Sequence, residues 1–271
     1  LHAKMMIIVR KEDNEILRYV HLSTGNYNEN TAKLYSDISI FTAEPEIAND
    51  ATLFFNMISG YSALQTMQKI KIAPINLKSN LISLIEREIQ NSSPEKPGLI
   101  IAKMNSLAHP EVIQALYKAS CANVKIKLNV RGICMLVPGV KNLSENIQVT
   151  SIIDRYLEHS RICYFQNGGD EEIYLSSADW MPRNLDRRVE IMFPILNKSI
   201  FTRIKSILNT YLEDTENTSI LNSDGSWSKI LNSQTEKTEK KFSAQKHFHE
   251  LAKTIEKSQK ENLTGEFVVR R

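Results

Sequence analysis

Residues 98–130 read GLIIAKMNSLAHPEVIQALYKASCANVKIKLNV, and this stretch decides the fold class. Its apolar patterning predicts a strand, a helix and a second strand at 98–103, 109–121 and 124–130. Pro110 stands just inside the helix start, where its missing N–H costs nothing. Arg131 directly follows the second strand, at the end of the strands where open α/β sheets bind ligands. The stretch therefore predicts an α/β fold with Arg131 near a ligand site.

The same kind of patterning continues on both sides of this stretch. Further strands are expected at 5–9, 16–23, 36–42, 147–153, 161–166, 172–177 and 188–193. Further helices are expected at 46–60, 76–91, 197–213 and 242–259. A change of unit falls near 69–74, so the chain is predicted to comprise three parts: 1–69, 70–213, and a loose connection with a C-terminal helix in 214–271.

Composition limits the classes of function. The chain has 271 residues, 42% of them hydrophobic, and a net charge of +3, which does not call for a nucleic-acid partner. No run of about 18 apolar residues is present, so we expect no transmembrane segment. Three cysteines without CxxC spacing favour a reducing, cytoplasmic location. Arginines nevertheless crowd the middle third and indicate a local site for a polyanion: Arg131, Arg155, Arg161, Arg183, Arg187 and Arg188.

One chemical pattern occurs twice along the chain. The first copy consists of His2-Ala3-Lys4, Thr24-Gly25-Asn26 and Asp37. The second copy consists of His159-Ser160-Arg161, Ser177-Ala178-Asp179 and Glu190. In both copies the final acid lies 11 positions after the amide or acid of the middle element, from 26 to 37 and from 179 to 190. Two copies predict two half-sites that face one another across a shared cleft.

The residue types in each copy are suited to phosphate chemistry. Neutral imidazole is a good nucleophile toward phosphorus, provided that the charge of the phosphate is offset. In an extended segment a cation two residues from a histidine lies on the same face, as Lys4 would beside His2 and Arg161 beside His159. Thr24 and Asn26 would donate to phosphate oxygens. The downstream carboxylate of either copy could fix the tautomer of an imidazole.

The H-x-K element, followed by a hydroxyl-x-Asn element, resembles the phospholipase D superfamily. In that superfamily two such halves meet, and one histidine attacks phosphorus. The second copy departs from the pattern, because Arg161 replaces the lysine and Asp179 replaces the asparagine. The two histidines are therefore not expected to have equivalent roles.

Longer segments resemble the bacterial polyphosphate kinase family. They read HAK (2–4), YVHLSTGNYN (19–28), AKLYSD (32–37), IAKMNSL (101–107), VRGIC (130–134), RYLEHSR (155–161) and SSADWMPRNLDRRVE (176–190). The resemblance runs from residue 1 to about 213, and nothing is carried over beyond residue 214.

The resemblance implies the C-terminal piece of a four-domain enzyme. Residues 1–69 would be the end of one phospholipase D-like domain, hence incomplete, and 70–213 a second one, each a mixed sheet flanked by helices. The family transfers the terminal phosphoryl group of ATP reversibly to polyphosphate through a phosphohistidine, with Mg²⁺. His2 matches the phosphorylated histidine, and Tyr35, Arg131 and His159 match nucleotide-contacting residues. The magnesium-associated residues of the family lie upstream, so no metal ligand is expected in this chain.

The expected roles follow from the residues and the resemblance together. His2 would attack the γ-phosphorus of ATP, and His159 would assist. Lys4, Arg131 and Arg161 would offset the charge of the transferring group. Arg183, Arg187 and Arg188 would hold polyphosphate. The alternative is that they cap carbonyl groups or pair with Asp186 or Glu190.

Other functions and properties stay open at this point. A phospholipase D-type phosphodiesterase is one alternative, and a non-catalytic fragment that binds polyanions is another, because this piece alone is expected to be inactive. We further expect ATP, ADP and polyphosphate as partners, a homo-oligomer at full length, and a cytoplasmic location, with association with the inner face of the membrane left open.

Overall fold

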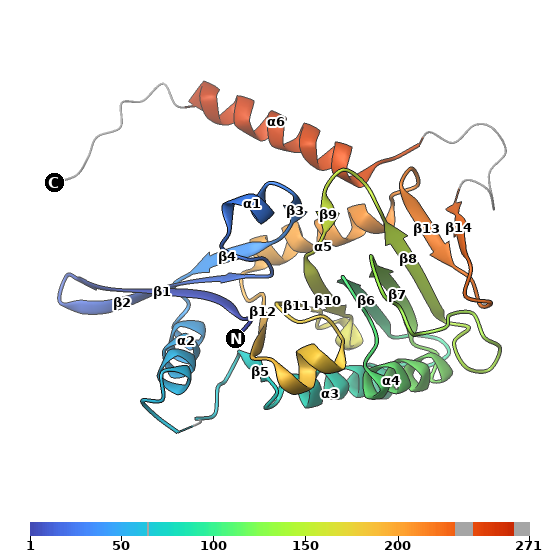
Figure 1. Cartoon of the computed structure of the whole chain (residues 1–271), viewed down its shortest axis with the longest axis horizontal. Helices are drawn as coiled ribbons and strands as arrows, with labels where there is room; N and C mark the ends of the chain where they lie inside the picture. The colour runs from blue at the N-terminus through green and yellow to red at the C-terminus, as the bar shows by residue number, and fades with distance from the viewer. Residues whose placement is uncertain (64, 231–240, 263–271) are drawn as a thin grey trace.

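The first unit is built on a three-stranded antiparallel sheet. The computed structural model describes residues 1–63, 65–230 and 241–262 (Figure 1). The strands of this sheet, in the order β1-β2-β4, are β1 (Lys4–Glu12), β2 (Glu15–Ser23) and β4 (Ser39–Thr42). The short helix α1 (Glu29–Ala32) lies in the connection after β2, and helix α2 (Pro45–Ile58) contacts β1 and β2.

A nine-stranded sheet forms the second unit, in the order β14-β13-β8-β7-β6-β10-β11-β12-β5. Its strands are β5 (Lys71–Ala73), β6 (Leu99–Met104), β7 (Lys125–Val130), β8 (Ile147–Ile152), β10 (Arg161–Phe165), β11 (Glu172–Ser176), β12 (Glu190–Pro194), β13 (Thr218–Leu221) and β14 (Trp227–Lys229). The pairs β6·β7 and β7·β8 are parallel and the remaining pairs are antiparallel. The sheet is therefore mixed, and the predicted α/β class is confirmed.

Helices cover both faces of this sheet (Figure 1). They are α3 (Leu77–Gln90) and α4 (Pro110–Cys121) on one face, with α5 (Lys198–Leu212) and α6 (Ala244–Asn262) toward the other; two single turns, η1 (Asn167–Gly169) and η2 (Arg183–Arg187), complete the unit. Because side chains alternate along a strand, β6 contributes to two cores. Ile100 and Ala102 pack with α3 and α4, whereas Ile101 packs with α2 and α5.

A short parallel pair joins the two units. It consists of β3 (Tyr35–Ser36) and β9 (Leu157–Glu158). The single strand predicted at 36–42 is therefore wrong: the chain pairs first with β9 and then, after Asp37 and Ile38, with β2. The break has a consequence for chemistry, because it leaves the Asp37 carboxylate free to turn toward Thr24 and His159.

The segment after residue 213 also differs from the prediction. Residues predicted as a loose connection contribute β13 and β14, which extend the sheet from β8 by antiparallel pairing. Thr218 and Leu221 of β13 are buried. The strand has only four residues and lies in a polar stretch of sequence, so its pattern did not indicate a strand. Residues 231–240 of the predicted connection lie outside the described residues. The predicted C-terminal helix is confirmed as α6.

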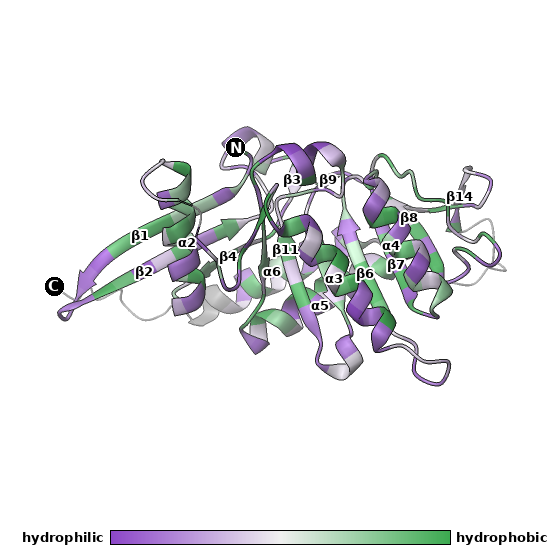
Figure 2. Cartoon of the chain, turned by 90° about the horizontal axis from the view of Figure 1, so that it is seen from below, coloured by the Kyte–Doolittle hydropathy of each residue, from purple (hydrophilic) through white to green (hydrophobic). Residues whose placement is uncertain are grey.

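The β1–β2 hairpin projects from the body of the molecule (Figures 1 and 2). Val9 and Ile16 near its tip are 59% and 64% exposed, whereas Lys4 and Ser23 at its base are buried. The base of the hairpin, rather than its tip, thus presents the first copy of the repeated pattern to the second unit. Among the described residues, no helix combines the length and the apolar character needed to span a membrane.

Candidate active site

The repeated pattern is also a repeated structure. In the first copy β1 and β2 place Lys4 opposite Ser23, and β2 and β4 place Ser23 opposite Ser39. In the second copy β10 and β11 place Arg161 opposite Ser176, which lies opposite Met192 across β11 and β12. Ser39 and Met192 each lie two positions after the acid of their copy. Both copies therefore use the same hairpin register, which sets the cation, the hydroxyl and the acid at corresponding places.

His2 is held by the acid of the second copy. Its Nδ1 lies 2.9 Å from Oε2 of Glu190, and its backbone N–H donates to the carbonyl of Val189. Glu190 is fully buried and also accepts hydrogen bonds from Ser177 Oγ at 2.5 Å and from Asn184 Nδ2 at 2.8 Å. The predicted neighbour Lys4 places its Nζ 2.9 Å from Nδ1 and 3.0 Å from Nε2 of His2.

His159 is held in the same way by the acid of the first copy. Its Nδ1 lies 2.9 Å from both oxygens of Asp37, and Thr24 Oγ1 donates to Asp37 Oδ1 at 2.7 Å. A guanidinium N–H of Arg161 donates to His159 Nε2 at 2.8 Å. Since arginine has no lone pair to offer, Nε2 accepts, and the neutral imidazole carries its proton on Nδ1 toward Asp37.

Each histidine is thus paired with the carboxylate of the opposite copy. The prediction that two half-sites meet is confirmed by these crossed contacts. Thr24, expected to donate to phosphate, is fully buried and donates to Asp37 instead, so that expectation is wrong. Ser177 occupies the matching place in the second copy, against Glu190. The hydroxyls therefore fix the acids, and the acids fix the imidazoles.

The two departures of the second copy compensate each other. Nε of Arg161 lies 3.3 Å from Asp179 Oδ1, and NH2 of Arg161 lies 2.8 Å from Asp179 Oδ2. Asp179 also accepts from the backbone N–H groups of Asn105 and Ser106. Arg161 is only 4% exposed, and its remaining contacts are His159 Nε2 and the carbonyl of Thr24. The second copy thus has an arginine and an aspartate where the first copy has a lysine and an asparagine. The two changes belong together, because the planar guanidinium and the carboxylate form one buried bidentate pair.

The contacts make the two histidines different. The side chain of His2 is 27% exposed and that of His159 is 12% exposed. Nε2 of His159 accepts from Arg161, whose guanidinium is held by Asp179, whereas Nε2 of His2 lies 3.0 Å from the ammonium of Lys4. Burial lowers the pKa of His159, and the Arg161 charge acts in the same direction, while the bond to Asp37 opposes it. His159 is thus a neutral hydrogen-bonding imidazole, and His2 is the more exposed of the two rings.

Lys4 sits in a strongly coupled electrostatic environment. Its side chain is nearly fully buried, and burial lowers its pKa to about 8. The charges of Arg161 and Arg188 act in the same direction, whereas Glu190 and Asp37 oppose the shift. An ammonium that is poorly compensated in this way gains by binding an anion.

Of the residues predicted to contact nucleotide, Tyr35 lies beside His159 and Arg131 is linked to the site through Asn105. The ring centroid of Tyr35 is 5.0 Å from that of His159. Arg131 donates to Asn105 Oδ1, and the backbone of Asn105 in turn donates to Asp179, which connects Arg131 to the site. The Nε of Arg131 is buried and has no hydrogen-bond partner. Arg131 therefore holds an unused donor at the C-terminal end of β7.

The predicted polyphosphate ligands are less tightly organised. Asn26, Arg183 and Arg187 are exposed and Arg188 is half-buried. Arg188 acts on the charge of Lys4 and directly precedes Val189, which binds the backbone of His2, so it lies at the site. The other three remain predictions from the sequence.

Two classes of site residue were missed from the sequence. The first is Gly25, where a Cβ would lie 2.1 Å from Asp37 Oδ2, so that only glycine fits. Its place in the sequence, between a threonine and an asparagine, does not reveal this close packing. Lys103 and Glu158 form a buried ion pair at 2.9 Å beneath His159. A lysine inside the apolar run of β6 was a usable signal for the second class.

The acids of the site are occupied by the protein itself. Glu190, Asp37 and Asp179 are each engaged in several protein hydrogen bonds. In the described ranges, no three His, Cys, Asp or Glu side chains gather in a way that could hold a metal ion. These residues do not fit a resident magnesium ion.

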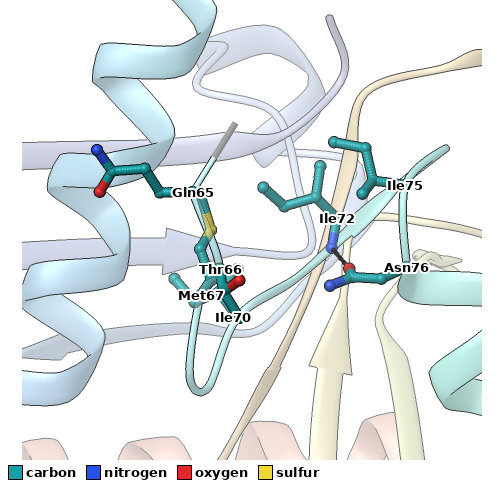
Figure 3. Close-up of a pocket in the computed structure, with 7 residues that line it drawn as sticks. All are labelled: Gln65, Thr66, Met67, Ile70, Ile72, Ile75 and Asn76. Atoms are coloured by element: carbon teal, nitrogen blue, oxygen red, sulfur yellow. Dashed lines mark hydrogen bonds between the residues drawn. The ribbon is translucent and has the colours of Figure 1, made fainter. Parts of the chain in front are cut away.

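A small pocket of about 180 Å³ lies where the two units join, in the segment from Gln65 to Asn76 (Figure 3). It is lined mainly by apolar side chains, and Asn76 Oδ1 accepts the N–H of Ile72 at 2.8 Å. None of the predicted site residues lines it. The pocket belongs to the packing of the junction, and the chemistry lies at the crossed histidines.

Comparison with known proteins gives a consistent set of similarities. The family description "Polyphosphate kinase C-terminal domain 1" matches residues 1–64, and "Polyphosphate kinase C-terminal domain 2" matches residues 70–245. The second match extends beyond residue 213, where the resemblance was expected to fade.

Individual relatives agree with these matches. A polyphosphate kinase of Rhodopirellula baltica is 50% identical over 229 residues, which cover 84% of this chain and 27% of that protein. One of Pseudomonas aeruginosa is 51% identical over 229 residues, with 84% and 33% covered. The crystal structure of the polyphosphate kinase from Porphyromonas gingivalis superposes with a TM-score of 0.87 at 38% identity, over 95% of this chain and 39% of that one. The chain thus spans no more than about a third of the curated relatives that it matches.

Proposed function

The chain belongs to the polyphosphate kinase family, and on that premise we propose that it carries the phosphoryl-transfer site of an ATP:polyphosphate phosphotransferase. The observation that carries the proposal is the asymmetry of the crossed pairs. Each ring has an acid at Nδ1 and a cation at Nε2, but the ring of His2 is 27% exposed and its cation is the ammonium of Lys4. The ring of His159 is 12% exposed, and its cation is Arg161, which Asp179 holds in place. One histidine as nucleophile, His2, and a second histidine that assists it, His159, suit a covalent transfer in two steps.

In the first step Nε2 of His2 attacks the γ-phosphorus of ATP. The N–P bond forms, the bond to the bridging oxygen breaks, and ADP leaves with that electron pair. Glu190 accepts the Nδ1–H of His2 and stabilises the positive charge that develops on the ring, while Ser177 and Asn184 hold Glu190 in place. In the second step a terminal oxygen of polyphosphate attacks the phosphoryl group, the N–P bond breaks, and His2 is regenerated.

The remaining residues provide charge and position. Lys4 and Arg131 offset the negative charge of the transferring group, since phosphoryl transfer depends mainly on positioning and electrostatics. Arg161 acts through His159 and Asp179. His159 assists when its Nε2 takes up a proton and donates to a phosphoryl oxygen, with Nδ1 held by Asp37. Tyr35 contacts the nucleotide beside His159, and Asn26, Arg183, Arg187 and Arg188 bind the polyphosphate chain. Magnesium accompanies ATP, a homo-oligomer forms at full length, and the protein acts in the cytoplasm.

Labelling with γ-labelled ATP tests this proposal. The protein at its natural length, incubated with the labelled ATP and Mg²⁺, is expected to carry acid-labile, base-stable phosphate that chases into polyphosphate or back into ATP when ADP is added. Label that is acid-stable, or its absence alongside cleavage of a phosphodiester, would contradict the proposal and favour a phospholipase D-type reaction. Polyphosphate binding without any turnover would instead indicate a binding fragment.

The pKa of Lys4 gives a prediction for pH dependence. Because that pKa is about 8 in the free protein, Lys4 loses its charge as the pH rises through this value, and kcat/KM should fall above it. Lys4→Arg keeps a positive charge at all these pH values and should remove this alkaline decrease, even if its maximum rate is lower. The measurement is the pH profile of kcat/KM for ATP in both proteins from pH 6.5 to 10. An alkaline decrease that persists unchanged in Lys4→Arg would show that another group causes it.

A further inference from the structure

A buried polar cluster lies directly beneath His159. Lys103 Nζ lies 2.9 Å from Glu158 Oε2 and donates to Ser160 Oγ at 2.9 Å. The side chains of Lys103 and Glu158 are each only 1% exposed. Glu158 and Ser160 are the two sequence neighbours of His159, so one buried ammonium fixes the strand on both sides of the histidine.

The same cluster reaches the first copy of the pattern. Ser36 Oγ donates to Glu158 Oε2 at 2.8 Å, and the Ser36 carbonyl accepts the N–H groups of His159 and Ser160. Ser36 is followed by Asp37, whose carboxylate holds His159 Nδ1. Glu158 therefore ties the segment that carries the acid to the segment that carries the imidazole, and any displacement of Glu158 changes their separation.

The third attachment of Glu158 comes from the C-terminal helix. Gln245, in the first turn of α6, donates from Nε2 to Glu158 Oε1 at 2.6 Å and to the Tyr156 carbonyl at 2.9 Å. Its Oε1 accepts the Tyr156 N–H at 2.9 Å. The Gln245 amide therefore bonds to both the N–H and the carbonyl of Tyr156, as a neighbouring strand would. The residues that follow Tyr156 form β9, which pairs with β3.

The first turn of α6 is itself anchored to the body. The Ala244 N–H donates to Asp214 Oδ2 at 2.8 Å, and Asp214 is only 1% exposed. Gln245 is 9% exposed, whereas Lys246 beside it is exposed and pairs with Glu216. The helix therefore begins inside the fold with one residue aimed at the strand of the second histidine.

We infer that Gln245 is a positioning residue for phosphoryl transfer, which sets the distance between His159 and Asp37 through Glu158 and Tyr156. The inference rests on the proposed function, and it assigns to the segment after residue 213 a part in the reaction. Gln245 does not touch the transferring group; it acts through the strand before His159.

Gln245→Met tests this role, with Lys246→Ala as the matched control on the same helix. Methionine keeps the length of the side chain but removes all three hydrogen bonds. Two quantities are measured at natural length: kcat and KM for ATP in polyphosphate formation, and the fraction of His159 that carries its proton on Nδ1, from ¹⁵N NMR of histidine-labelled protein assigned with His159→Ala. For Gln245→Met we expect kcat to fall about 10- to 100-fold with KM within about threefold, and the Nδ1–H fraction to fall. Lys246→Ala should match the unsubstituted protein in both.

Gln245→Glu provides the second variant. It has the same shape and can still accept from Tyr156, but it places a carboxylate against Glu158, so it should impair kcat at least as much as methionine does. Turnover of Gln245→Met within twofold of the control overturns the inference, and so does a fall in kcat with an unchanged Nδ1–H fraction. If the unsubstituted protein transfers no phosphoryl group, the proposed function fails; an NMR fraction that then stays unchanged in Gln245→Met would overturn the positioning role separately.

Discussion

His2→Ala is expected to lose all phosphoryl labelling from ATP and to lower turnover by about 10⁴-fold or more, as removal of a covalent nucleophile does. The reason is that His2 is the more exposed imidazole of the site, with Glu190 fixed behind it by Ser177 and Asn184. The measurement combines retention of ³²P on the protein after rapid mixing with steady-state formation of polyphosphate.

The same experiment separates the roles of the two histidines. His159→Ala should still be labelled, but about 10²- to 10⁴-fold more slowly, because it removes an assisting group and not the nucleophile. His21→Ala is the control: His21 lies on β2, its Nδ1 is 2.9 Å from the Tyr27 hydroxyl, and its ring lies beside those of Tyr27 and Phe41. Label that survives in His2→Ala and disappears in His159→Ala would reverse the assignment.

Lys103→Met is expected to cause the largest loss of stability, about 3–5 kcal/mol in the free energy of unfolding. The substitution leaves the Glu158 carboxylate, 1% exposed, without its buried cation. Burial raises the pKa of Glu158, but Lys103, Gln245 and Ser36 outweigh this and hold it below its ordinary value. Without Lys103 burial dominates and the folded-state pKa rises above that of the unfolded chain. The missing stability should therefore be greatest at neutral pH and shrink as the pH falls toward 5.

Urea denaturation of three variants checks this result. In Lys103→Met/Glu158→Gln the buried charge is removed along with its partner, and we expect most of the lost stability to return. Glu158→Gln alone should be strongly destabilised, because it leaves the Lys103 ammonium unpaired. A loss below about 1 kcal/mol for Lys103→Met at pH 7, or no recovery in the double variant, would contradict the expectation.

Much of the local structure followed from sequence patterning. The apolar runs of β6 and β7, the helical spacing of α3 and the proline at the start of α4 are local signals, and these elements form where they were predicted. The strands β3, β5, β9, β13 and β14 were missed because each has only two to four residues, and such short strands are stabilised by partners far away in the sequence. The free energy of such pairing depends on the distant partner, so the sequence of the short strand itself does not reveal it.

The candidate site divides in the same way. The sequence by itself determined which residues are present in each copy, because a repeated order of histidine, cation, hydroxyl and acid is visible without any structure. It also predicted that Lys4 and Arg161 lie beside their histidines, since two residues apart on an extended segment means the same face.

Which acid binds which histidine depends on the folded arrangement. Spacing within a copy is compatible with pairing inside that copy, yet Glu190 holds His2 and Asp37 holds His159. The choice depends on how two hairpins with the same register face each other, and on the short β3–β9 pair that fixes Asp37 against His159. The two imidazoles also differ in their surroundings, because the buried Arg161–Asp179 pair lies beside His159 alone. The strength of that pair depends on the exclusion of water and on its bidentate geometry. A linear pattern can supply such groups, but burial and distance exist only in the folded chain.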